Sequence, residues 1–373
     1  MKLSTTIRNA AFLAMLTPTS ATPYPVRTLY QFADNATWIE NVAVRPNGNL
    51  LVTLLAPSAD LYEIVLSNNH PSSGPSASNT TTTTGTTAVE ARLVRRFAAY
   101  EGLTGIAETA PDVFAVLAGN YSDPSTASWS LWEADFTSSS SSSSSSAAIN
   151  ELVPSIPNAL VLNGMTTTAP LLQRDDGVQL LISDSTAGHV LRVTTAAAAD
   201  DDDDIAVYLA DDPTTSPPNA SLPTGVNGVR YLPDSSSSSS SSGDGGYLYF
   251  TNTYRALFCR VRIDDDDDDD GNDEAVAAAA KVEVLAEGVK GDDFAVRWEE
   301  GSGGVVAYVT DGVDGEVVRV VVGGRSGEEE KKDVLVEGEK ATSAAFGRGP
   351  GDGDVLYVVT RGGKVLAVDL GGS

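Results

Sequence analysis

The chain has 373 residues, of which 41% are hydrophobic, and its 24 Lys and Arg against 51 Asp and Glu give a net charge of −27. This charge excludes a basic nucleic-acid-binding face and argues against binding to anionic membranes, while the hydrophobic content excludes wholesale disorder. With one cysteine, Cys259, the chain can form neither an internal disulfide nor a thiolate metal cluster.

The first residues have the order of a secretory signal peptide. Lys2 and Arg8 accompany the apolar stretch Ala10–Leu16, and the small residues Thr19-Ser20-Ala21 follow. We therefore expect a signal peptide over residues 1–21 and a secretory or extracellular protein, with a disordered tail as the alternative. No later segment approaches the roughly 18 apolar residues of a membrane span. Four sequons are compatible with secretion and glycosylation: Asn35, Asn79, Asn120 and Asn219.

A sixfold repeat runs through the rest of the chain. After a strand predicted over Val26–Phe32, six segments begin with polar or small residues and continue as short apolar strands. They begin at Glu40-Asn41, Thr104-Gly105, Asn163-Gly164, Asn227-Gly228, Asp293-Phe294 and Thr342-Ser343. Alternating apolar and polar residues, bounded by Gly, Asp and Pro, predict the later strands of each unit. In chain order these are Asn49–Leu55, Asp60–Leu66 and Ala91–Phe97; Asp112–Ala118, Ser128–Phe136 and Ile149–Val153; Val178–Ser183, Gly188–Thr194 and Ile205–Leu209; Tyr247–Asn252, Ala256–Ile263 and Lys281–Leu285; Val305–Thr310, Gly315–Val322 and Asp333–Val336; Asp354–Thr360 and Gly363–Asp369.

The sixth unit lacks a fourth strand, and Val26–Phe32 lacks a partner. Both facts are explained if the N-terminal strand closes the last sheet. The sequence thus predicts an all-β fold, a six-bladed β-propeller with four-stranded blades, as one domain over residues 22–373. Two packed β-sandwiches are the alternative.

Low-complexity tracts interrupt loops of only two kinds. One falls between a first and a second strand, and the others fall between third and fourth strands. They are Ser67–Thr87, Ser138–Ser146, Ala196–Asp204, Ser235–Ser242, Asp264–Ala280 and Gly323–Lys332. In a propeller both kinds of connection emerge on one face, and loops there tolerate polar insertions at little cost. We therefore expect the functional site on the opposite face, which lacks these inserts.

Four of the six inner strands start with oxygen donors suited to a hard cation: Glu40, Asn163, Asn227 and Asp293. Carboxylate and amide oxygens favour Ca²⁺ or Mg²⁺ over thiophilic metals. The alternative is that these are ordinary turn residues at strand starts.

This set resembles the gluconolactonase (senescence marker protein) family, six-bladed propellers that hold a divalent metal with Glu, two Asn and Asp at the channel mouth. The resemblance implies lactone hydrolysis in which Asp293 helps to activate water. Val161 stands where that family has an arginine that binds sugar acids, and Glu40-Asn41-Val42 replaces a Glu-Gly-Pro start. Both changes make the mouth less polar.

Four sequence segments are more similar to a fungal branch, the hetero-Diels–Alderases of tropolone–sesquiterpenoid biosynthesis, than to the gluconolactonases. They are residues 38–49, 111–120, 162–167 and 248–253. This resemblance implies a secondary-metabolite enzyme, without a required cofactor, that joins a quinone-methide-type diene to a terpene alkene. Such a site orients two apolar reactants and hydrogen-bonds the oxygen that gains charge. Trp38 and Tyr254 would be walls, and Asn120, Asn252 and Tyr254 would be donors beside Asn227. For the aromatic residues the alternative is packing between blades, and a glycosylated Asn120 could not line a pocket.

Other catalytic machinery finds no support. The two histidines, His70 and His189, come without a Gly-x-Ser-x-Gly elbow, and Cys259 alternates with apolar residues on a strand, as a buried side chain does. A pericyclase acting on a small apolar molecule, as a monomer, is therefore the first expectation. A metal-dependent lactone hydrolase is the second and a non-catalytic binding propeller the third.

Overall fold

The structure, a computed structural model, describes residues 24–371 apart from residues 67–88, 124, 138–145, 169–177, 196–204, 211–212, 235–244, 264–280, 303, 323–331 and 350. The predicted signal peptide, His70, Asn79 and nearly all residues of the low-complexity tracts lie outside the described residues. Within the described part, no helix has the length and apolar character needed to cross a bilayer.

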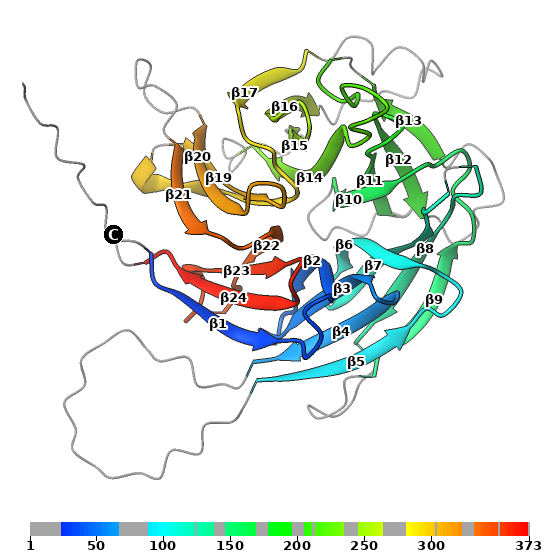
Figure 1. Ribbon diagram of the computed structural model, residues 1–373, viewed down its shortest axis with the longest axis horizontal. Helices are drawn as coiled ribbons and strands as arrows, with labels where there is room; N and C mark the ends of the chain where they lie inside the picture. The colour runs from blue at the N-terminus through cyan, green and yellow to red at the C-terminus, as the bar shows by residue number, and fades with distance from the viewer. Residues whose placement is uncertain are drawn as a thin grey trace, which may run out of the picture.

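The described chain forms six four-stranded antiparallel sheets arranged in a ring (Figure 1), which confirms the predicted six-bladed β-propeller. In blades 1 to 5 the strands follow chain order from the axis outward. They are β2 (Trp38–Val44), β3 (Leu50–Ala56), β4 (Asp60–Val65) and β5 (Glu90–Arg96); β6 (Gly102–Ala110), β7 (Val113–Asn120), β8 (Ser128–Asp135) and β9 (Ala148–Val153); β10 (Leu162–Thr167), β11 (Val178–Asp184), β12 (His189–Thr195) and β13 (Ile205–Leu209); β14 (Val226–Pro233), β15 (Gly246–Asn252), β16 (Leu257–Ile263) and β17 (Glu283–Glu287); β18 (Phe294–Glu299), β19 (Gly304–Asp311), β20 (Glu316–Val322) and β21 (Lys332–Glu337).

Blade 6 combines the two ends of the chain. It contains β22 (Ala341–Phe346), β23 (Val355–Thr360), β24 (Lys364–Asp369) and, at its outer edge, β1 (Val26–Gln31). The blue β1 and the red β24 lie side by side in Figure 1, with Val26 opposite Val368 and Gln31 opposite Lys364. The predicted closure by the N-terminal strand is therefore confirmed. It covers what would otherwise be an open sheet edge at β24.

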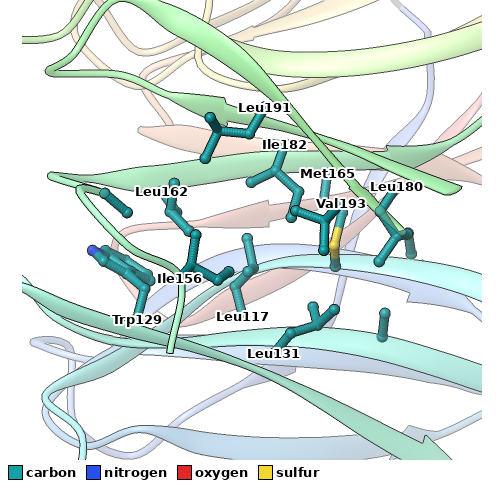
Figure 2. Close-up of a cluster of buried hydrophobic side chains, with 13 residues drawn as sticks. Leu117, Trp129, Leu131, Ile156, Leu162, Met165, Leu180, Ile182, Leu191 and Val193 are labelled. Carbon is teal, nitrogen blue, oxygen red and sulfur yellow. The ribbon is translucent and has the colours of Figure 1, made fainter. Parts of the chain in front are cut away.

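Apolar side chains pack between neighbouring blades, because each blade buries both of its faces against the next. Figure 2 shows one such cluster, in which Leu117, Trp129 and Leu131 of blade 2 meet Leu162 and Ile182 of blade 3. Cys259 is buried in another cluster. Since Trp129 also reaches the pocket described below, packing between blades fixes part of the pocket wall.

Candidate functional site

Near the start of each inner strand lie two residues that we call an entry pair. The six pairs are Glu40-Asn41, Thr104-Gly105, Asn163-Gly164, Asn227-Gly228, Asp292-Asp293 and Thr342-Ser343. In five blades the register between the first two strands shifts at the entry pair, so that a β-bulge forms there. In blade 5 the pair lies just before β18, where the Asp292 N–H donates to Thr310 O (2.7 Å) and the Thr310 N–H donates to Asp293 O (3.0 Å). A bulge turns a side chain out of the regular alternation of a strand.

The first members of five entry pairs line one pocket: Glu40, Thr104, Asn163, Asn227 and Asp292. Thr342, the first member in blade 6, does not line it and instead donates a hydrogen bond to Ile39 O at 2.6 Å. The bulges of blades 1 to 4, together with the connection before β18 in blade 5, therefore bring polar side chains from five blades to one end of the central channel.

The second members face the channel axis. In blades 1, 5 and 6 they are Asn41, Asp293 and Ser343, which meet Arg230 in a group that we call the axial knot. One Asp293 carboxylate oxygen accepts hydrogen bonds from Asn41 Nδ2 (2.9 Å) and Ser343 Oγ (3.2 Å) and forms an ion pair with Arg230. Asn41, Asp293 and Ser343 are buried.

In blades 2 to 4 the second member is glycine, because the inner strands approach too closely for a side chain. A Cβ on Gly228 would lie 2.5 Å from Asp293 Oδ1 and 2.6 Å from Asp293 Cα. A Cβ on Gly164 would lie 2.6 Å from the carbonyl oxygen of Asn227. Glycine follows the polar residue in these pairs because the blades are in contact there. The pairs are not turns at strand starts, since Asn163-Gly164 and Asn227-Gly228 lie inside strands.

Hydroxyl groups of second strands hold the backbone of the first members. Thr53 Oγ1 donates to Thr104 O (2.7 Å), and Thr251 Oγ1 donates to Asp292 O (2.7 Å), in each case in the next blade. Ser183 binds Asn227 O in the same way. Blades 1, 3 and 4 thus each position the pocket residue of the next blade.

The pocket has a volume of about 250 Å³, and its lining includes an aromatic wall made of Trp38, Tyr121, Trp129 and Tyr254. Tyr121 and Trp129 stack, with ring centroids 6.2 Å apart. The Trp129 Nε1–H donates to Leu160 O, at 3.1 Å, so this pair presents mainly carbon surface. Tyr254 is 36% exposed and forms the rim.

Two kinds of connection build most of the rest of the pocket. Connections between second and third strands supply Tyr121, Thr253, Tyr254, Gly312, Val313 and Arg361, and connections between fourth and first strands supply Val161, Thr224 and Asp292. These are the two kinds of connection that carry no low-complexity insert. A second pocket, which includes Arg230 and Phe346, lies at the inner strands beyond the axial knot.

Four buried polar atoms, each in a residue that lines the pocket, have no hydrogen-bond partner: Trp38 Nε1, Glu40 Oε2, Thr104 Oγ1 and Asn227 Oδ1. Among the described residues only Trp132 Nε1 and Ser185 Oγ share this property, and neither residue lines the pocket. Buried polar atoms without partners are costly and uncommon in native proteins. Their concentration here indicates a site built to bind a ligand.

Two neighbouring carboxyl groups dominate the electrostatics of the pocket. Burial raises the pKa of Glu40 to about 7, and the Asp293 charge adds to this, while Trp38 and the Arg361 charge oppose it. The Trp38 N–H lies near enough to the Glu40 carboxyl group to favour its ionised form, but the two do not form a hydrogen bond of ordinary geometry. Burial and the Glu40 charge also raise the pKa of Asp292, although Asn227 Nδ2 donates to it at 2.8 Å. Near neutral pH, desolvation therefore favours neutral forms of this pair.

The sequence-predicted residues fall into two groups. Trp38, Glu40, Asn163, Asn227 and Tyr254 line the pocket. The other three predicted residues do not, and each has its polar atoms engaged elsewhere.

Asp293 belongs to the axial knot, and Asp292 is the carboxylate at the pocket in its place. Asn252 Nδ2 donates to Thr214 O and Ser216 O, at 2.9 and 3.0 Å, so its amide holds the connection before β14. The Asn120 side chain accepts from Glu101 N (3.0 Å) and donates to Ser128 Oγ (3.1 Å).

Sequence reasoning missed Thr104, Tyr121, Trp129, Asp292 and Arg361, all of which line the pocket. A signal for Asp292 was present. It stands two residues before the buried Phe294, just as Glu40 stands two residues before Val42 and Asn227 stands two before Val229. The loop residues Tyr121 and Arg361 carry no repeat signal, because the connections that hold them differ between blades.

No model of a known protein family matches the chain. A segment of 42 residues is 50% identical to a protein of Phoma sp. described as a "putative hetero-Diels-Alderase". This match spans 11% of the chain and 12% of that relative.

Solved propellers resemble the whole chain at low sequence identity. A luciferin-regenerating enzyme matches 94% of this chain and 96% of its own, with a TM-score of 0.55 and 13% identity. A calcium-bound family AA12 carbohydrate-active enzyme of Trichoderma reesei matches 94% of this chain and 96% of its own, with a TM-score of 0.52 and 12% identity. The soluble aldose sugar dehydrogenase of Escherichia coli matches 93% of this chain and 99% of its own, with a TM-score of 0.51 and 12% identity. At these identities the likeness shows a shared fold.

Proposed function

We propose that this protein is a pericyclase of the hetero-Diels–Alderase type, which joins a quinone-methide-type diene to a terpene alkene in the aromatic pocket. The observation that carries the proposal is the group of unpartnered polar atoms beneath aromatic walls. Two of them, Trp38 Nε1 and Thr104 Oγ1, have a hydrogen to donate. The short similarity to the Phoma protein supports the same reaction class.

The reaction would need orientation and hydrogen bonding rather than a nucleophile. The carbonyl oxygen and the exocyclic carbon of the diene each form a σ bond to one alkene carbon, the three π bonds of the reactants become one, and nothing leaves. The aromatic walls would stack the conjugated diene, and donors beside its oxygen would stabilise the charge that develops there. Only the reacting ends fit within about 250 Å³, so the remainder of the terpene would extend over the rim at Tyr254.

The direct test is incubation of the purified protein with a diene precursor and a sesquiterpene alkene. Formation of one stereoisomer of the dihydropyran faster than in buffer supports the proposal. The same product mixture and rate as in buffer would contradict it.

Trp38→Phe is expected to lower the cycloaddition rate about tenfold, because it removes one donor to the charged oxygen. The measurement is the single-turnover rate at saturating diene. Trp132→Phe is the matched control, since its buried Nε1 also has no partner but lies outside the pocket. Equal rates for the two variants would show that the Trp38 N–H has no part in the reaction.

One observation favours a second candidate, a metal-dependent lactone hydrolase. Glu40 Oε2 and Asn227 Oδ1 are buried acceptors without partners, and Asn163 and Asp292 line the same pocket. This oxygen-rich set fits Ca²⁺ or Mg²⁺, although the described residues contain no cluster of three or more His, Cys, Asp or Glu side chains. When bound, such a cation would polarise a lactone carbonyl. Asp292, rather than Asp293, would be the carboxylate placed to take a proton from water.

If the protein is a lactonase, a chelator should abolish lactone hydrolysis and added Ca²⁺ or Mg²⁺ should restore it. Glu40→Gln should then weaken metal binding, measured by calorimetry, because it replaces a charged ligand with a neutral one. Cycloaddition should persist in the chelator. Lactone turnover that is unaffected by the chelator would exclude this candidate.

A further inference from the structure

Arg361 differs from the other arginines near the channel in forming no close ion pair within the described part of the chain, although its charge acts on the carboxyl groups of Glu40 and Asp292 in the same pocket. It lies directly after β23, lines the pocket and is half-buried. Its guanidinium donates one long hydrogen bond, of 3.4 Å, to Gly312 O. No Asp or Glu among the described residues forms an ion pair with it, whereas Arg230 pairs with Asp293 and Arg348 with Glu108. Most of its five N–H donors are therefore available to a ligand.

Trp38 holds this guanidinium in place. The central carbon of Arg361 lies 3.7 Å from the centroid of the Trp38 ring, a close cation–π contact. Stacking restricts the guanidinium to a plane and leaves its N–H edge free, which prepares it to bind an oxyanion. The stacked Tyr121 and Trp129 rings supply flat surface in the same pocket.

We propose that Arg361 binds the anionic oxygen of a planar, conjugated substrate, such as a carboxylate or an enolate, whose ring lies against the aromatic wall. This inference rests on the proposed function, because it assigns one end of the diene to the Arg361 side of that same pocket. A charged N–H donor at a delocalised oxygen would also stabilise the negative charge that grows during cycloaddition.

The binding test uses two probes of equal shape, naphthoate and its neutral amide naphthamide. Their affinities are measured by calorimetry in the presence of a chelator at about pH 6, where the carboxylate of naphthoate is ionised. The wild-type protein is expected to bind naphthoate at least about tenfold more tightly than naphthamide, as a charge-assisted hydrogen bond in a partly buried site would give. In Arg361→Met the two affinities should become equal. Arg361→Lys should retain part of the preference, because it keeps the charge but loses the planar fork.

Arg348→Met is the matched control. Arg348 is 35% exposed and pairs with Glu108, which lines the second pocket, beyond the axial knot. This variant should keep the full preference for naphthoate. Equal affinity of the wild type for both probes, or an unchanged preference in Arg361→Met with a native circular dichroism spectrum, would overturn the proposal. Should Arg361→Met not fold, a reduced preference in Arg361→Lys decides in favour and an unchanged preference decides against.

Because these probes do not react, the result is independent of the proposed cycloaddition. Probe binding that depends on Arg361, without product in the cycloaddition assay, would contradict the pericyclase and leave the anion site standing. Product formation at an unchanged rate and affinity, with a diene whose reacting carbonyl oxygen is intact but whose separate carboxylate or enolate oxygen is methylated, would overturn the anion site and leave the pericyclase standing.

Discussion

Asp293→Ala is expected to lower the free energy of unfolding by about 3–5 kcal/mol, the usual cost of removing one partner from a buried ion pair. The Asp293 side chain is 4% exposed and that of Arg230 is 19% exposed, so the arginine would be left charged and poorly hydrated. The same carboxylate oxygen accepts hydrogen bonds from Asn41 and Ser343, which belong to blades 1 and 6. The measurement is equilibrium unfolding in urea.

Asp314→Ala provides the comparison. Asp314 pairs with Lys290 on the surface, where the two side chains are 52% and 41% exposed, and such solvent-screened pairs contribute little to stability. Asp293→Asn should lie between these two variants, because it can still accept a hydrogen bond from Asn41. If Asp293→Ala costs no more than Asp314→Ala, the axial knot does not stabilise the ring.

Glu40→Gln is expected to make the protein more stable than the wild type above neutral pH. Burial raises the pKa of Glu40 from 4.5 to about 7 in the folded protein. Between these pH values the unfolded chain has released the proton and the folded protein still holds it, so the stability of the wild type falls as the pH rises. Since one pH unit in a pKa corresponds to about 1.4 kcal/mol, the loss is about 3 kcal/mol above pH 7.

Glutamine has no proton to lose, so the two proteins should be equally stable near pH 4 and should diverge by about pH 8. Unfolding is measured in chelator, since a bound cation would favour the ionised glutamate. Glu101→Gln is a control of opposite sign. Hydrogen bonds from the Tyr121 and Ser122 N–H groups lower the pKa of Glu101, so its replacement should destabilise the protein at neutral pH. A wild type that is as stable at pH 8 as at pH 5 would contradict the assignment for Glu40.

Much of the fold could be predicted from the sequence, because strand periodicity is a local property. Each blade repeats the same alternation of apolar and polar residues, and the unpaired strand at Val26–Phe32 could only complete the unit that ends at Asp369. The site was predicted in part for the same reason. Glu40, Asn163 and Asn227 recur at one position of the repeat, and all three line the pocket.

The choice between Asp292 and Asp293 required the tertiary structure. The two residues are chemically identical and adjacent, and their shared backbone pairing with Thr310 just before β18 leaves Asp292 lining the pocket while Asp293 faces Arg230 at the axis. Likewise, Asn252 resembles a free donor in the sequence, but its amide is used by the connection at residues 214–216.

The sequence by itself determined the number of blades, the closing strand and the face that holds the pocket, because these follow from periodicity and from where polar inserts interrupt it. Only the tertiary structure decided which polar groups remain without partners, among them Trp38 Nε1 and most of the Arg361 guanidinium. That property depends on contacts between blades far apart in the chain, and no local pattern of residues encodes it.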